Sequence, residues 1–253
     1  MNKLSNKKVL ITGASQGLGR ALTLAYAKEN AEAISISARD KASLNKVASQ
    51  INKLSPSTKV IVIAGDLSLP KDVERIVATT LKAFGGRIDV LVNNASTIGP
   101  TPMPYLLDYP LEDFNKVLKT NLIGPFLMIR LVLSSMIENG GSIINVTSDA
   151  GVIGYPGWGA YGISKFGLEG MSQTWASELQ DTSVRVNWVD PGGMNTSMHK
   201  AAEPDEDPEQ WADPSSVTDV FVFLASDESI SVTGHRLKAQ ENWKKLIKTK
   251  RHA

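Results

Sequence analysis

Tyr161 and Lys165 lie four residues apart in the stretch AYGISK, just after the loop SDAGVIGYPGWG. On a helix, residues i and i+4 share a face, with Cβ atoms roughly 5–6 Å apart. A free tyrosine titrates near pKa 10, which is too high for an efficient acid or base near neutral pH. An ammonium group about 4 Å away, at an effective dielectric near 20, would favour the phenolate by roughly 4 kcal/mol. The pair predicts a tyrosine acid/base whose pKa the lysine lowers by about 3, although a bare Y-x3-K is a weak motif.

A glycine-rich turn lies near the N-terminus. In KVLITGASQGLGRAL, an apolar run leads into Gly13, Gly17 and Gly19, with the spacing G-x3-G-x-G, and a helical pattern follows. Glycine lets the backbone approach a pyrophosphate, and a helix N-terminus supplies N–H donors and a partial positive charge. The turn therefore predicts a dinucleotide phosphate site, with a ligand-free strand–helix turn as the alternative interpretation.

The end of the second predicted strand should contact the ribose of such a dinucleotide. An acidic residue there binds the 2′-hydroxyl of NAD, whereas a cation accommodates the 2′-phosphate of NADP. The stretch ISISARD places Arg39 and Asp40 at this point. Arg39 favours NADP because guanidinium binds phosphate through two hydrogen bonds. An inward-facing Asp40 would instead favour NAD, and two surface charges at a helix start are the third interpretation.

The elements that position these residues alternate along the chain. Apolar β-branched runs predict parallel strands buried on both faces, at residues 8–12, 33–37, 59–64, 89–94, 142–148 and 184–190, with a seventh at 234–240. Helical patterns separate them, at 17–29, 41–54, 70–84, 111–138, 158–180 and 214–225. Pro125 should distort the helix over 111–138. The alternation predicts a single Rossmann-type α/β domain over 1–253, with a doubly wound, mainly parallel seven-stranded sheet.

Composition excludes several classes of protein. The net charge of +1 gives no overall field for nucleic acid or a membrane, and the absence of cysteine excludes disulfides, a thiol nucleophile and thiolate metal ligands. No uninterrupted apolar run reaches the roughly 18 residues of a membrane span, and the N-terminal run is too short for a signal peptide. We therefore expect a cytoplasmic protein without a metal site.

Taken together, these motifs resemble the short-chain dehydrogenase/reductase family over nearly the whole chain, from Val9 to about Leu237. The matching segments are Thr12 through Gly19, Asp66-Leu67, Asn93-Asn94-Ala95-Ser96, Asn121 in KTNLIG, Ser148 thirteen residues before Tyr161, Tyr161 with Lys165, and Pro191-Gly192 through Thr196. Each motif alone is weak, but their joint order and spacing is specific. Ser96 departs from the family glycine, and the usual aspartate–glycine ending of the last strand is missing.

The resemblance implies hydride transfer between the nicotinamide of NADP, with NAD as the alternative cofactor, and a carbonyl or secondary alcohol. It implies Ser148, Tyr161, Lys165 and Asn121 as catalytic residues, Asn121 holding a water near Lys165. The implied cofactor-binding residues are Gly13, Ser15, Gly17, Leu18, Gly19, Arg39, Asp66, Leu67, Asn93, Tyr161, Lys165, Met194 and Thr196. It also implies a homo-oligomer, a tetramer or a dimer, built through the helices at 111–138 and 158–180.

Two segments depart from the regular pattern. Residues 193–212 carry five acids between Glu203 and Glu209, and we expect them to form a mobile substrate lid. Residues 241–253 form a basic tail, for which disorder is favoured over an amphipathic helix through Trp243, Leu246, Ile247 and Lys250. The substrate pocket should be apolar with few charges, lined by Met103, Tyr105, Tyr155, Trp158, Met194, Met198 and Trp211.

Two other functions stay open. A non-catalytic NADP(H)-binding sensor or scaffold protein could share this fold, although it would not need a titratable tyrosine. An epimerase or dehydratase acting on a nucleotide-linked sugar is the third hypothesis, but the chain is short for the extra substrate domain of such proteins. The sequence does not identify the substrate, because fold-level analogy does not transfer it.

Overall fold

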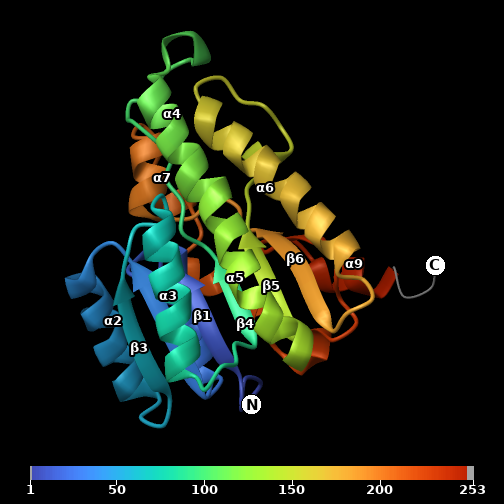
Figure 1. The fold of residues 1–253 in the computed structure, drawn as a ribbon. Helices are drawn as coiled ribbons and strands as arrows, with labels where there is room; N and C mark the ends of the chain where they lie inside the picture. The colour runs from blue at the N-terminus through green and yellow to red at the C-terminus, as the bar shows by residue number, and fades with distance from the viewer. Residues whose placement is uncertain (1, 250–253) are drawn as a thin grey trace.

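The computed structural model describes residues 2–249 as a three-layer α/β domain around one seven-stranded sheet (Figure 1). The strand order is β3-β2-β1-β4-β5-β6-β7, and all six neighbouring pairs are parallel. The strands are β1 Lys8–Thr12, β2 Ala33–Ala38, β3 Lys59–Ala64, β4 Val90–Asn93, β5 Gly141–Val146, β6 Val184–Asp190 and β7 Arg236–Lys238. The order in which strands are added to the sheet reverses between β1 and β4. Sheets of this kind bind ligands at such a point.

Helices cover both faces of the sheet, which explains why the strands are apolar throughout. The main helices are α1 Gly17–Lys28, α2 Lys41–Leu54, α3 Pro70–Ala83, α4 Leu111–Leu118, α5 Gly124–Asn139, α6 Gly159–Glu178, α7 Ser197–Ala202, α8 Asp219–Ala225 and α9 Trp243–Thr249. In Figure 1, α3, α5 and α6 lie in front of the sheet. Two clusters of buried apolar residues occupy the two sides of the sheet, one with α1, α2 and α8 and the other with α3 and α5.

The long helix predicted over 111–138 is interrupted, as Pro125 required. A π-helical segment, Lys119–Ile123, joins α4 to α5. Proline has no N–H, so Pro125 cannot donate to the carbonyl of Asn121 four residues earlier. Single π-helical turns of this kind are frequent at functional sites.

Two predicted boundaries near the C-terminus need correction. The helix expected over 214–225 is a 3₁₀ turn, Pro214–Val217, followed by α8. The seventh strand is limited to Arg236–Lys238, because the chain turns away after β7. Short 3₁₀ turns also occur at Leu106–Asp108, Asp149–Gly151, Pro208–Gln210 and Asp227–Ser229.

The prediction of a disordered C-terminal tail is wrong for the part that the structure describes. Residues Trp243–Thr249 form α9, and Trp243 and Ile247 are each only 8% exposed. Trp243 lies with its ring centroid 5.1 Å from that of Phe223 on α8. The apolar stripe of α9 outweighs its high charge, because burying two large side chains offsets the cost of ordering one short helix. Lys250 lies outside the described residues.

One helical stretch of the described residues, Leu111–Asn139, meets the length and hydropathy of a membrane span. The core helix of a folded domain meets the same test, and 44% of the apolar window is buried against the rest of this chain. The stretch is therefore weak evidence for a membrane protein.

Candidate active site

The glycine-rich turn packs directly against the end of β4. Gly13 has a positive φ of 67°, and a Cβ there would lie 2.7 Å from the Cα of Ala95. A Cβ on Gly19 would collide with the carbonyl of Gly13. The Asn94 amide donates to the carbonyls of Thr12 and Gly13 at 2.9 and 3.1 Å. Only glycine fits these positions, and Asn94 holds the turn in place.

The turn ends at a helix N-terminus that has free donors. Gln16, the N-cap of α1, makes no side-chain capping bond, so its side chain leaves the first amides of α1 unsatisfied. In contrast, the side chain of Asp40 caps α2. An uncapped N-terminus facing a cavity is suited to bind a phosphate.

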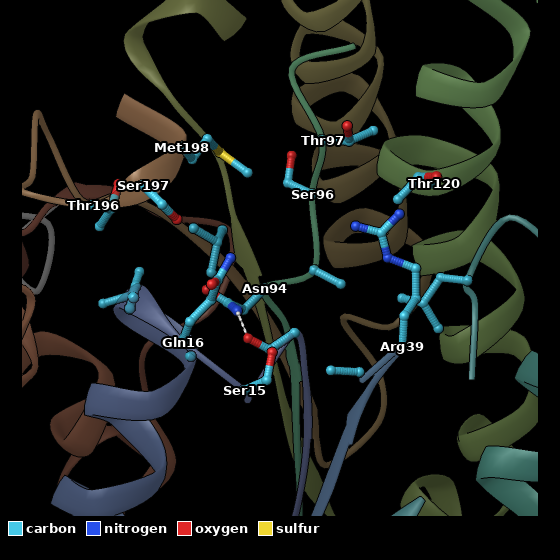
Figure 2. A pocket seen from close by; sticks show the side chains of 18 of the residues that line it. Ser15, Gln16, Arg39, Asn94, Ser96, Thr97, Thr120, Thr196, Ser197 and Met198 are labelled. Carbon is cyan, nitrogen blue, oxygen red and sulfur yellow. Dashed lines mark hydrogen bonds between the residues drawn. The ribbon is translucent and has the colours of Figure 1, made fainter. Parts of the chain in front are cut away.

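A cavity of about 490 Å³ extends from this turn along the carboxyl ends of the strands. Of the predicted cofactor-binding residues, it is lined by Gly13, Ser15, Gly17, Leu18, Gly19, Arg39, Asp66, Leu67, Tyr161, Lys165, Met194 and Thr196. Figure 2 shows Ser15 and Gln16 at one end, Arg39 on one wall and Thr196 with Met198 on another. These residues come from distant parts of the chain, and the sheet brings them together.

Asn93 is the exception among the predicted cofactor-binding residues, because its side chain does not line the cavity. It lies within β4, is 2% exposed, and donates to the amide oxygen of Asn145 at 2.9 Å. Alternate residues of a strand point to opposite faces, so only one asparagine of the pair can face the cavity. The structure places Asn94 there.

Arg39 and Asp40 have separate roles in the structure. The Asp40 carboxylate accepts from the backbone amides of Ala42 and Ser43, at 2.9 and 3.3 Å. Hydrogen bonds from Ser43 and Ala42 lower the pKa of Asp40. The side chain of Arg39 instead extends along the cavity wall (Figure 2). Asp40 is therefore a helix cap, which leaves Arg39 as the side chain available to a ribose phosphate.

Tyr161 and Lys165 share one face of α6, as their spacing predicts. The Lys165 ammonium lies 5.4 Å from the centroid of the Tyr161 ring and donates to the carbonyl of Val146 at 2.8 Å. Tyr161 is 8% exposed and Lys165 is 3% exposed. The Ser148 hydroxyl lies near the Tyr161 hydroxyl and acts to lower the Tyr161 pKa, while it donates to Asp149 Oδ1 at 2.8 Å. The three side chains thus meet at the carboxyl end of β5.

The predicted effect of Lys165 on the pKa of Tyr161 does not appear in this structure. Burial raises the pKa of Tyr161 to about 12; the hydrogen bond from Ser148 opposes this, and Asp190 and Asp149 raise the pKa further. Burial also lowers the pKa of Lys165 to about 8, against the charges of Asp190 and Glu169. Desolvation therefore outweighs the attraction between the two side chains, and Tyr161 is protonated at neutral pH.

Asn121 is buried in the π-helical segment and does not line the cavity. Its side-chain amide donates to the carbonyl of Thr97 at 2.8 Å and to Ser164 Oγ at 3.0 Å, and its oxygen accepts from the amide of Thr97 at 2.8 Å. Both N–H groups of the side chain are thus used within the protein. Asn121 fastens the chain after β4 to α6, and its side-chain amide is occupied by these contacts.

Comparison with known proteins identifies the family to which this fold and this cavity belong. The family model described as short chain dehydrogenase matches residues 7–207. The chain belongs to the short-chain dehydrogenase family. It is 39% identical to the 3-oxoacyl-acyl-carrier-protein reductase FabG of Thermotoga maritima, covering 92% of this chain and 95% of that protein. It is 36% identical to glucose 1-dehydrogenase of Gluconobacter oxydans, covering 93% and 91% of the two chains. A short chain dehydrogenase from Shigella flexneri, solved in complex with NADP, superposes with a TM-score of 0.88 at 29% identity, covering 95% and 100%.

This short-chain dehydrogenase has a second cavity of about 490 Å³ that adjoins the first at Tyr161 and is lined also by Ser148. The apolar residues predicted there include Tyr155, Trp158, Met194, Met198 and Trp211, and all five line it. Met103 packs behind it instead, and Tyr105 is exposed. The expectation of few charges is wrong, since the lining contains Asp149, Asp190, Glu203, Glu206 and Glu241 with Lys238 and His199.

The segment predicted to be a lid covers this second cavity. It contains α7 and the 3₁₀ turn Pro208–Gln210, and a β-bridge joins Met194 to Ala212 at its ends. His199 on α7 packs against Trp211, with ring centroids 4.2 Å apart, and lies 3.1 Å from a carboxylate oxygen of Glu206. The segment is therefore folded rather than aperiodic. Its ordering by cofactor stays a prediction.

Sequence reasoning missed an ionic cluster behind Tyr161 and Lys165 of this short-chain dehydrogenase. Arg236 on β7 pairs with Glu169 on α6 at 2.9 Å and with Asp190 on β6 at 3.1 Å. Glu169 lies four residues after Lys165, so helical spacing could have placed it beside Lys165. No sequence pattern could have placed Arg236 there, because only the pairing of strands in the sheet brings it to this position.

Proposed function

We propose that the protein is an NADP(H)-preferring oxidoreductase that transfers a hydride between nicotinamide and a carbonyl or secondary alcohol of a small substrate. The observation that carries the proposal is the position of Tyr161, which lines both cavities with Ser148 beside its hydroxyl. A proton donor between a dinucleotide cavity and a second cavity suits reaction at a carbonyl group.

The chain's own residues hold the reactants and move the proton. The nicotinamide, when bound, supplies or accepts the hydride. In reduction, the protonated Tyr161 hydroxyl donates to the substrate oxygen, and the Ser148 hydroxyl orients that oxygen. The Lys165 ammonium favours the phenolate that results, because an opposite charge stabilises it. As the family resemblance implies, Asn121 would hold a water near Lys165 through which the proton is replaced from solvent.

The residues present fit NADP. The uncapped N-terminus of α1, Ser15 and the glycine-rich turn would hold the pyrophosphate, Asp66 and Leu67 the adenine, and Thr196 with the backbone near Met194 the carboxamide. Arg39 would bind the 2′-phosphate, since Asp40 is turned into the α2 cap. NAD remains the alternative cofactor. It lacks the 2′-phosphate, so its binding would require only the contacts to the pyrophosphate, the adenine and the carboxamide.

The second cavity supports a neutral or cationic substrate with an apolar part. Trp158, Met198 and Trp211 supply apolar surface, while the carboxylates that line the cavity outnumber its cations. Anions are repelled by a cleft lined with one sign of charge. Among ketones of similar size, those carrying a carboxylate should therefore show the highest KM.

The decisive test is Tyr161→Phe, measured by NADPH oxidation over a panel of ketones, aldehydes and β-ketoesters. Loss of the acid should lower kcat by 10²- to 10⁴-fold, while the Kd for NADPH stays within a few-fold. A variant that kept more than about a tenth of kcat would exclude Tyr161 as the acid/base.

The alternative is a non-catalytic NADP(H)-binding sensor or scaffold protein. Tight NADPH binding by the wild type, without turnover of any member of the panel, would favour it. We also propose, from composition alone, that the protein is cytoplasmic.

A further inference from the structure

Arg236 makes three contacts that converge on the back of the proposed catalytic group. Its Nε donates to Glu169 Oε1 at 2.9 Å, and its terminal nitrogen donates to Asp190 Oδ2 at 3.1 Å and to the backbone carbonyl of Ser148 at 3.0 Å. The contacted residues come from α6, β6 and the loop after β5. One guanidinium thus ties together three elements that each carry or flank a residue of the proposed site.

The two carboxylates that Arg236 binds are nearly inaccessible to water, with side chains 5% and 7% exposed. Glu169 also accepts from Thr147 Oγ1 at 2.8 Å and from Trp188 Nε1 at 2.5 Å, and Asp190 accepts from the amide of Gly192 at 2.9 Å. Two buried negative charges require a buried positive partner, and Arg236 is the side chain that pairs with both.

These charges act on the reacting groups. Asp190 raises the pKa of both Tyr161 and Lys165, and Glu169 raises that of Lys165. The charged and titratable groups around the pair are Asp149 on the turn after β5 with Tyr155 beside it, Glu169 on α6, Asp190 on β6, and Arg236 and Lys238 on β7. Arg236 is the member of this set that offsets Asp190 and Glu169 together.

We propose that Arg236 is a positioning residue for the proposed reaction: it holds the backbone of Ser148 beside Tyr161 and offsets the negative charge that Asp190 and Glu169 place behind Tyr161 and Lys165. The inference rests on the proposed function, because it assigns Arg236 a role toward that catalytic set. Loss of Arg236 should therefore misplace Ser148 and let the two carboxylates act on Lys165 in full.

The test compares Arg236→Met, Arg236→Lys and a matched control, Arg185→Met. Arg185 is also a partly buried arginine of this sheet edge, but it donates to Ser229 Oγ and to the carbonyl of Leu224, near the opposite end of β6. The first readout is the Kd for NADPH as a function of pH, which needs no turnover. In the wild type it should weaken with a midpoint near the Lys165 pKa of about 8. In Arg236→Met the midpoint should rise by about one pH unit, because the carboxylates stabilise the ammonium more.

The second readout is steady-state kinetics on the substrate panel. Arg236→Met should lower kcat by about 10- to 100-fold through misplacement of Ser148, with a much smaller change in KM. Arg236→Lys, which keeps the charge, should keep the wild-type midpoint and recover part of kcat. Arg185→Met should leave the midpoint unchanged whatever it does to thermal stability.

An unmoved midpoint in Arg236→Met, or an equal movement in Arg185→Met, would show that Arg236 is merely structural. Should Arg236→Met fail to fold, Asp190→Asn replaces it, and the midpoint should then fall rather than rise; a midpoint that stayed in place would overturn the inference. Absence of turnover in the wild type would overturn the proposed function but leave the binding readout intact. The two failures are therefore distinguishable.

Discussion

At Lys165, the cost of burial competes with the attraction of neighbouring carboxylates. Burial wins and lowers the pKa from the ordinary value of 10.5 to about 8, while Tyr161 stays protonated up to about 12. Below pH 8 the lysine is an ammonium ion that can favour the phenolate; above pH 8 it is neutral. The group that titrates near the working pH is thus the lysine rather than the tyrosine.

We expect kcat/KM for carbonyl reduction to fall as the pH rises through about 8. Measured at subsaturating NADPH, the parameter kcat/KM reports the ionisation of the free enzyme. The measurement is a pH profile with the Lys165→Met variant as control, which should be slow and show no such transition. A wild-type profile that stayed flat to pH 10 would show that Lys165 titrates like an exposed lysine.

We expect one side chain, that of Arg39, to select NADPH over NADH. Arg39→Ala should raise the KM for NADPH roughly 10- to 150-fold, which corresponds to losing a charge-assisted contact of about 1.5–3 kcal/mol. The KM for NADH should change little, because NADH has no 2′-phosphate. Equal effects on both cofactors would mean that Arg39 has a structural role only, and a wild type that preferred NADH would contradict the NADP assignment.

Among the elements, the packing of α9 on the core can be tested by changing one side chain. Trp243→Ala should lower the free energy of unfolding by roughly 3 kcal/mol, since it empties an apolar site against Phe223 and the core. Trp243→Phe keeps an aromatic ring there and should lose much less. Denaturant unfolding of both variants checks this, with truncation after Gln240 as the larger change. Unchanged unfolding midpoints in all three would mean that α9 does not dock in solution.

The π-helical segment both connects two helices and positions a side chain. It joins α4 to α5 in one continuous helical stretch, and within it the Asn121 side chain bonds to Thr97 and Ser164. Pro125 forces the interruption, and the asparagine amide fixes the chain that forms one wall of the first cavity. The distortion is thus part of how the fold builds the site.

For the whole molecule, exposed apolar side chains on neighbouring helices predict assembly. Phe126, Leu131 and Ile137 on α5 and Ile163 and Phe166 on α6 are all more than a third exposed. A face of this kind usually marks an interface. We propose that two or four copies associate through α5 and α6.

Sedimentation velocity tests the assembly. Phe166→Glu should shift the protein to a smaller species, because a carboxylate would have to be buried in the interface. Leu54→Glu is a matched control: Leu54 is 48% exposed, close to the 47% of Phe166, but it ends α2 at the opposite edge of the sheet. A monomeric wild type, or equal dissociation by both variants, would contradict the proposal.

The sequence by itself determined the order of strands and helices, the glycine-rich turn and the pairing of Tyr161 with Lys165. These are local features, and periodicity, glycine geometry and helical spacing depend on residues close together in the chain. The same reasoning could not separate Asn93 from Asn94, because the register that turns one of them into the cavity depends on the neighbouring strands.

Only the tertiary structure decided the electrostatics of the site. The pKa of Tyr161 rises rather than falls because burial, which no local pattern reports, outweighs one nearby cation. The acidic lining of the second cavity and the contacts of Arg236 with Glu169, Asp190 and Ser148 arise from segments up to 88 residues apart. Charges that meet through the fold, in a medium of low dielectric, interact far more strongly than their sequence positions suggest.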